Sequence, residues 1–254
     1  MPIVITEQKG VVTGNHAPLD TCDILKYIAF TMAQHVLEVN GASIVLTGSF
    51  NPTIFQPQWF ARQNLLPPEE CEKAEIKVIA PQICEFQTER FIIQVTTERF
   101  SALSKPDANP APLRDLVAGT FFTLEHTPLN ALGLNRDMHF AISSEELWHK
   151  VGDTLVPKEI WHGVLRGRVG MKAVLVQAEV PAFPDEKQES ARLSVRIEPS
   201  PRVKLGVYFQ FNEHFTAPKD EASGYLIERI RSRWEGAYSY AAEVANHIIS
   251  SIVG

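Results

Sequence analysis

Three segments of this 254-residue chain alternate between apolar and polar side chains: residues 91–98, 193–198 and 203–212. A period of two is typical of a β-strand that buries one face and leaves the other in water. Such one-sided strands favour an antiparallel sheet, because a parallel sheet is normally covered on both faces. The sequence therefore predicts an α+β protein with a mainly antiparallel sheet and with helices packed on one face.

Apolar residues at helical spacing separate these strands. Residues 20–40 are expected to form a helix that ends at Asn40-Gly41 and follows a short N-terminal strand. Other expected helices cover residues 57–66, 113–125, 144–155 and 220–252, and other expected strands cover 42–50, 75–86, 90–103, 132–142 and 171–180.

The long C-terminal helix carries one apolar stripe. The stripe consists of Leu226, Ile230, Trp234, Ala237, Ala241, Val244 and Ile248. We expect most of it to lie along the sheet, and residues 241–252 are candidates for an overhang that pairs with another chain.

A short pattern occurs twice, as Trp59, Leu66, Pro68 and Glu70 and again as Trp148, Leu155, Pro157 and Glu159. The order of expected elements also repeats. We interpret this as an internal duplication of β-α-β-β(-β)-α units over residues 42–130 and 131–254, with an N-terminal strand and helix over 1–41, in one globular unit. The alternative is chance spacing in an ordinary α+β chain. Both Trp side chains are expected in the core.

The composition limits the kinds of partner and the cellular location that can be expected. The net charge is −6, which disfavours binding to nucleic acid, although it leaves a local basic patch open. The sequence has no apolar run long enough for a membrane span and no secretory signal. Its three cysteines are scattered, so a cytoplasmic location is expected.

The common catalytic and cofactor motifs are missing from the sequence. The Gly-rich segment 163–170 lacks the Lys-Ser/Thr of a phosphate loop and is interpreted as a linker, and no zinc or nucleophile-elbow motif occurs. No cofactor or metal is therefore expected. One group of residues could still bind a metal ion if the two halves of the chain converge: His139 and His214 with Asp137 and Glu213. The simpler interpretation is that these residues lie at strand ends and face solvent.

The sequence favours a non-catalytic subunit of a protein complex, or a self-associating chain, that binds through its sheet face or its C-terminal helix. The alternatives are a ligand- or nucleic-acid-binding module that uses the polar sheet face, and an enzyme whose site is assembled from distant residues. Tyr208 is the expected anchor of the polar face. The binding residues predicted there are Gln94, Glu98, Arg196, Lys204, Tyr208, Gln210 and Asn212, with Thr96, Ser194 and Glu198 beside them.

Overall fold

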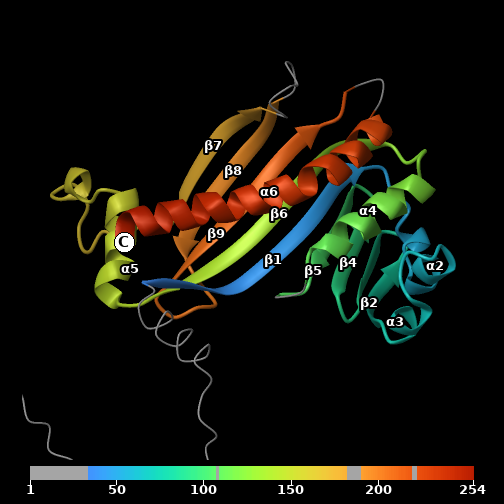
Figure 1. Ribbon diagram of the computed structural model, residues 1–254, viewed down its shortest axis with the longest axis horizontal. Helices are drawn as coiled ribbons and strands as arrows, with labels where there is room; N and C mark the ends of the chain where they lie inside the picture. The colour runs from blue at the N-terminus through green and yellow to red at the C-terminus, as the bar shows by residue number, and fades with distance from the viewer. Residues whose placement is uncertain (1–33, 107–108, 182–189, 219–221) are drawn as a thin grey trace, which may run out of the picture. The chain divides into compact units, whose positions relative to one another are not determined.

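The computed structural model describes residues 34–106, 109–181, 190–218 and 222–254 (Figure 1). Nine strands form one antiparallel sheet in the order β2-β3-β4-β5-β1-β6-β9-β8-β7. The strands are β1 (His35–Gly48), β2 (Glu75–Ala80), β3 (Ile83–Gln87), β4 (Phe91–Thr96), β5 (Arg99–Ser104), β6 (Leu129–Ile142), β7 (Val174–Pro181), β8 (Ser190–Pro199) and β9 (Gly206–Thr216). The α+β class and the large antiparallel sheet are confirmed.

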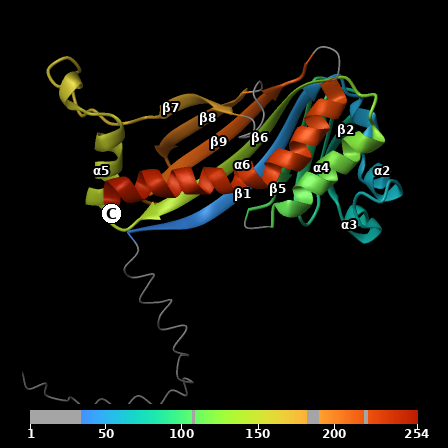
Figure 2. The same cartoon turned by 45° about the horizontal axis from the view of Figure 1, so that its top comes forward.

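The helices lie on one face of this sheet. They are α2 (Pro57–Arg62), α3 (Pro68–Glu72), α4 (Ala111–Thr123), α5 (Glu145–Leu155) and α6 (Ala222–Val253), with short 3-10 turns η1 (Pro52–Ile54) and η2 (Glu159–Trp161). The long helix α6 crosses the central strands, and α4 packs beside its N-terminal half (Figure 2). Ser144 is the N-cap of α5, as expected. Its hydroxyl accepts a hydrogen bond from the Leu147 amide at 3.2 Å.

The core between sheet and helices consists of two apolar clusters. The first is rich in phenylalanine and lies under α4 and the start of α6, where Phe55, Phe100 and Phe121 pack against one another. The second lies under the C-terminal half of α6 and includes Phe140 and Phe209. Helix α6 contributes to both clusters, so it joins the two ends of the sheet.

A buried polar seam separates the two clusters below the middle of α6. Arg136 of β6 donates through Nε to the Asn40 side chain at 3.2 Å, and its guanidinium lies 3.7 Å from the centroid of the Tyr238 ring. Burial lowers the pKa of Arg136, and Tyr238 partly opposes this. Glu213 of β9 is also buried, and Arg233 of α6 donates to it through Nε at 3.1 Å. These contacts fix α6 against β6 and β9.

The expected N-terminal helix is wrong at its end. Residues His35–Asn40 belong to β1, which pairs with β6 from His35 opposite Ile142 onward. Val36 therefore matches a helical spacing by chance, and long-range pairing overrides the local pattern. The rest of the expected helix and the first expected strand fall on residues 1–33, which lie outside the described residues.

Other expected strands also differ in their boundaries, and three of the changes have a clear local cause. Residues 75–86 and 90–103 are each a hairpin, with turns between β2 and β3 and between β4 and β5. Strand β9 begins at Gly206 instead of Val203, because Leu205 has a φ of 50°, which is incompatible with a strand.

The predicted buried stripe of α6 is confirmed in the first half of the helix, whereas in the second half other positions are buried. Leu226, Ile230, Trp234 and Ala241 are buried as expected. Beyond them the buried positions are Ala245, Ile249, Ile252 and Val253, whereas Val244 and Ile248 are only partly buried. Residues 241–252 thus pack on the second cluster and do not overhang, so the idea of a pairing overhang is wrong.

Both repeated tryptophans are half-buried at the margins of the core rather than central to it. Trp59 packs against the first cluster and Trp148 against the second. The Trp148 indole donates to the Gly206 carbonyl oxygen at 2.9 Å. Among the described residues, no helix is long and apolar enough to cross a membrane.

Candidate interaction surface

The face of the sheet opposite α4 and α6, called here the uncovered face, carries most of the predicted binding residues. Their strand neighbours in sequence are buried on the helix side. The residues placed on this face are Gln94, Thr96, Ser194, Arg196, Glu198, Tyr208, Gln210 and Asn212. Glu98 and Lys204 are instead exposed in the connections β4–β5 and β8–β9, because the strands end before them.

Many side chains of the uncovered face are already paired with one another. Asn212 donates to the Asn135 side chain at 2.6 Å, and Gln94 donates to Glu85 at 2.7 Å. Arg196 and Glu198 form an ion pair at 2.7 Å. The uncovered face is therefore polar and largely satisfied by its own contacts.

Tyr208 is held in place by neighbours from β6. Its hydroxyl donates to the Asp137 carboxylate, and its ring stacks on His139 with centroids 4.5 Å apart. Burial, followed by the hydrogen bond with Asp137, raises the pKa of Tyr208. His139 is buried, which lowers its pKa, and its Nδ1 lies 2.8 Å from the Ser200 hydroxyl. Tyr208 is thus half-buried and already bonded, which limits what it can offer as an anchor.

A polar groove of about 230 Å³ runs over β1, β6 and β9 on the uncovered face. Its lining includes Thr47, Arg99, Asn135, Asp137, Gln210 and Asn212. Gly133 forms part of its floor, where a Cβ atom would lie 2.8 Å from the Asn212 amide nitrogen.

The metal set considered from the sequence is not assembled. His214 lies opposite Gly133, whereas His139 lies opposite Tyr208, six residues further along β6. At about 3.3 Å per residue, the two imidazoles are roughly 20 Å apart. Glu213 is on the other face, bonded to Arg233. Within the described part of the chain, no three His, Cys, Asp or Glu side chains are grouped to hold a metal ion.

A cavity of about 700 Å³ lies between α5 and the connection that leads from it to β7. Trp148, Val151 and Met171 supply apolar lining, and His149, His162 and Arg168 supply polar lining. The connection packs loosely around its glycines, since no heavy atom lies within 4 Å of a Cβ built on Gly163 or Gly167. Both glycines have positive φ angles, 81° and 98°.

Exposed apolar side chains are concentrated in the same stretch of the sequence. Six of the eleven exposed large apolar side chains among the described residues fall within residues 160–176. We call these six the apolar rim. They are Ile160 (72% exposed), Trp161 (39%), Val164 (75%), Leu165 (52%), Leu175 (72%) and Val176 (52%). None of the six is among the binding residues predicted from the sequence, although the uncharged run Val174–Ala178 and the nearby run Val164-Leu165 are visible there.

Strand β7 forms one end of the sheet among the described residues. It pairs with β8 through eight consecutive residue pairs without a register shift. The helix layer does not cover it: Val176 is on the helix side, opposite the buried Val195, yet is 52% exposed. Figures 1 and 2 show β7 beyond the reach of α6.

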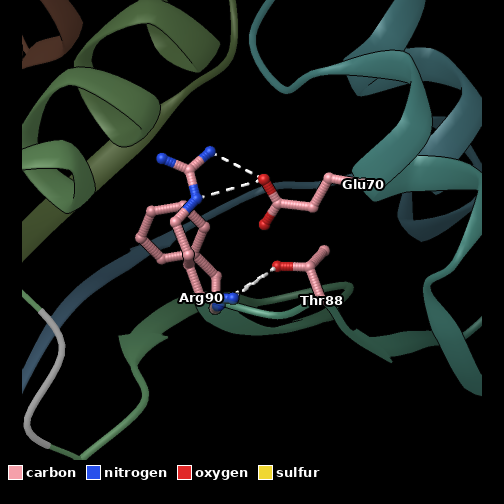
Figure 3. Close-up of polar contacts among 4 residues, drawn as sticks. Glu70, Thr88 and Arg90 are labelled. Carbon is pink, nitrogen blue, oxygen red and sulfur yellow. Dashed lines mark hydrogen bonds and ion pairs between the residues drawn. The ribbon is translucent and has the colours of Figure 1, made fainter.

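An ion pair holds the first copy of the repeated sequence motif in place. Glu70 of α3 accepts hydrogen bonds from Arg90 Nε at 3.1 Å and Nη2 at 2.7 Å, which ties α3 to the β3–β4 turn (Figure 3). The Thr88 hydroxyl in that turn accepts from the Phe91 amide at 3.1 Å. Burial alone raises the pKa of Glu70, but hydrogen bonds with Arg90 and Thr88 and the charge of Arg90 outweigh it, so the pKa is lowered.

Comparison with known proteins gives no relative: no protein-family model and no curated protein matches this sequence.

Proposed function

We propose that this chain is a non-catalytic subunit that binds another protein chain through β7 and the apolar rim. The observation that supports the proposal is the concentration of six exposed apolar side chains within residues 160–176. On a folded protein, so many exposed apolar side chains within one short stretch of chain favour an interaction site.

The energetic reason is the cost of leaving these side chains in water. Burying one Leu or Val side chain stabilises a complex by roughly 1.5–3 kcal/mol. Leu175 and Val176, both more than half exposed, therefore supply a substantial driving force for association. The other surfaces considered have less to offer, since the uncovered face is polar and self-paired and the α6 stripe is filled by the chain's own core.

The test is purification from the native host with two matched variants. Val176→Lys places a charge on β7, and Ile79→Lys places the same charge on β2, at the other end of the sheet, where Ile79 is 38% exposed. We expect a partner chain that co-purifies in a constant molar ratio with the wild type and with Ile79→Lys. Val176→Lys should lose it. Retention of that partner by Val176→Lys at the wild-type yield contradicts the proposal.

A second candidate function is binding of a small polar ligand in the groove of the uncovered face, which its lining of amide, carboxylate and guanidinium groups supports. Gly133→Val should block that groove, because the new side chain would meet Asn212. A thermal-shift screen of polar metabolites should then find a stabilising compound for the wild type and none for the variant. Equal stabilisation of both proteins contradicts this function.

We also infer that the two halves arose by duplication. The supporting feature is the strand order, in which β1 and β6 are central neighbours and the last strand of each half, β5 or β9, lies beside the first. Each central strand is followed by a helix that bears a tryptophan, α2 or α5. An experimental structure should allow the halves to be superposed with Trp59 over Trp148, and non-equivalent positions of these helices on their sheets contradict the inference.

A further inference from the structure

We propose that the partner's contact segment is an extended, acidic stretch of chain that adds to the sheet as a strand alongside β7. This inference rests on the proposed function, and it specifies how the partner binds and what charge it carries.

The backbone of β7 is suited to strand addition. An edge strand presents a row of unpaired N–H and C=O groups, which an extended segment of another protein can pair with. Strand β7 pairs with β8 without a register shift, so the outward-facing N–H and C=O groups of residues 174–180 follow one another regularly, and only Pro181 at its end lacks an N–H. It also has no charged side chain from Val174 to Ala178 that would oppose an incoming strand.

Apolar surface lies on both sides of this edge. Leu175 is opposite Arg196 on the uncovered face, and Val176 is opposite Val195 on the helix side. Val176 is 52% exposed on the helix side, so an apolar side chain of the added strand can lie against it there. The added strand would thus bury apolar side chains of β7 on both faces, as alternate residues of a β-strand do.

The charge around β7 favours an acidic segment. Lys158 is paired with Asp153 of α5, so it is left out of the count. The rest of the connection before β7, residues 159–173, contains Arg166, Arg168 and Lys172 against Glu159, which is +3 − 1 = +2, whereas the whole chain carries −6. Arg192 of β8 lies opposite Glu179 of β7 and offsets that negative charge. Arg166, Arg168 and Lys172 are exposed, so a partner can reach their charges. Complementary charge of this kind selects partners and speeds their encounter.

A second copy of this chain fits less well as the occupant. The strand that it would add, β7, carries a single acidic residue, Glu179, and Arg192 of its own β8 already lies opposite that residue. Edge-to-edge dimerisation is therefore the competing outcome that an experiment must detect.

The experiment uses three fluorescein-labelled heptapeptides and the full chain. The first alternates Glu and Val, the second replaces every Glu with Lys, and the third carries Pro at the centre of the Glu-Val sequence. We expect saturable binding of the Glu-Val peptide in fluorescence anisotropy. The Lys and Pro peptides should bind at least about tenfold more weakly, the first through charge and the second through loss of a backbone donor.

Hydrogen–deuterium exchange locates the peptide. Exchange of the β7 amides should slow when the Glu-Val peptide binds, and exchange in β2 should stay unchanged. Val176→Lys should abolish the slowing, and Ile79→Lys should preserve it. Arg166→Glu with Arg168→Glu should weaken binding at least about tenfold and remove most of its salt dependence.

Several results overturn the inference. They are equal binding of the Glu and Lys peptides, slowed exchange at the uncovered face instead of β7, and a doubled molar mass in light scattering that Val176→Lys abolishes, which would make a second copy the occupant. If the Glu-Val peptide fails while Val176→Lys still loses the native partner, strand addition is wrong and the proposed function stands. If the peptide binds at β7 while Val176→Lys keeps its native partner, the proposed function fails instead.

Discussion

The two ends of the sheet differ in how their outer strands are protected. Strand β2 carries a register shift between Ile76 and Val78, an ion pair between Glu75 and Lys77, and the packed turn η1 beside it. Strand β7 is regular, and its residues from Val174 to Ala178 carry no charge. Irregularity, charge and covering are the usual devices by which proteins prevent edge pairing.

The halves differ in the same direction at their repeated motif. Glu70 is mostly buried and bonded to Arg90, whereas Glu159 at the corresponding motif position is exposed in η2. The motif glutamate is therefore packed into the structure in the first half and exposed to solvent in the second. The difference teaches that one sheet can protect one of its outer strands and leave the other exposed, and that the protected strand shows what the exposed one lacks.

The largest expected effect tests whether the second half is open because it is loosely folded. Phe100→Ala in the first cluster and Phe209→Ala in the second should each lower the free energy of unfolding by about 3–5 kcal/mol, because both side chains are fully buried. Urea denaturation measures both losses. A loss below about 1 kcal/mol for Phe209→Ala alone would mean that the second cluster is poorly packed and that the exposure of β7 reflects incomplete folding.

A medium effect is expected at the repeated glutamates. Glu70→Gln should lower the free energy of unfolding by roughly 1–3 kcal/mol, since it weakens charge-assisted hydrogen bonds to Arg90. Glu159→Gln, at an exposed position, should change it by less than about 0.5 kcal/mol. Equal losses in chemical denaturation would remove the contrast between the two motifs.

The Glu70 effect should depend on pH in a defined direction. The pKa of Glu70 is lowered in the folded protein, so its ionised form contributes stability above the unfolded pKa of about 4.3. That contribution is lost as the pH falls through the lower folded pKa. The gap between wild type and Glu70→Gln should therefore be constant from about pH 6 to 8 and shrink below about pH 4.5. A gap that widens in acid contradicts the assigned role of Arg90.

The smallest effect is expected for the edge substitutions on the isolated protein. Val176→Lys and Ile79→Lys each place a charge at an exposed strand position, so each should change the free energy of unfolding by less than about 0.5 kcal/mol. Thermal and urea unfolding measure this. If Val176→Lys costs several kcal/mol, Val176 is part of the folded core and loss of a partner by this variant no longer reports on binding.

Local patterns were sufficient to predict much of the fold. Alternation identified the sheet and the side of Gln94, Arg196 and Asn212, and the Ser144 cap identified the start of α5. They failed where distant pairing decides the structure, as at His35–Asn40, which is strand only because β6 lies beside it.

The interaction surface was missed for a related reason. The run Val174–Ala178 has the composition of a buried strand, and nothing local indicates whether such a strand is central or at an edge. That depends on the strand order of the whole sheet, which places β7 last among the described strands. The shift of the buried stripe on α6 after Ala241 likewise depends on which strands lie beneath the helix.

The most direct measurement of the difference between the edges is hydrogen–deuterium exchange of the chain alone and in complex with its native partner. Strand addition at β7 predicts that amides within Val174–Ala178 exchange more slowly in the complex, while those of Glu75–Ala80 in β2 exchange at the same rate in both states. Unchanged exchange in β7 in a complex shown to be fully formed, or slowing confined to β2 or to the uncovered face, would contradict the assignment of β7 as the docking edge.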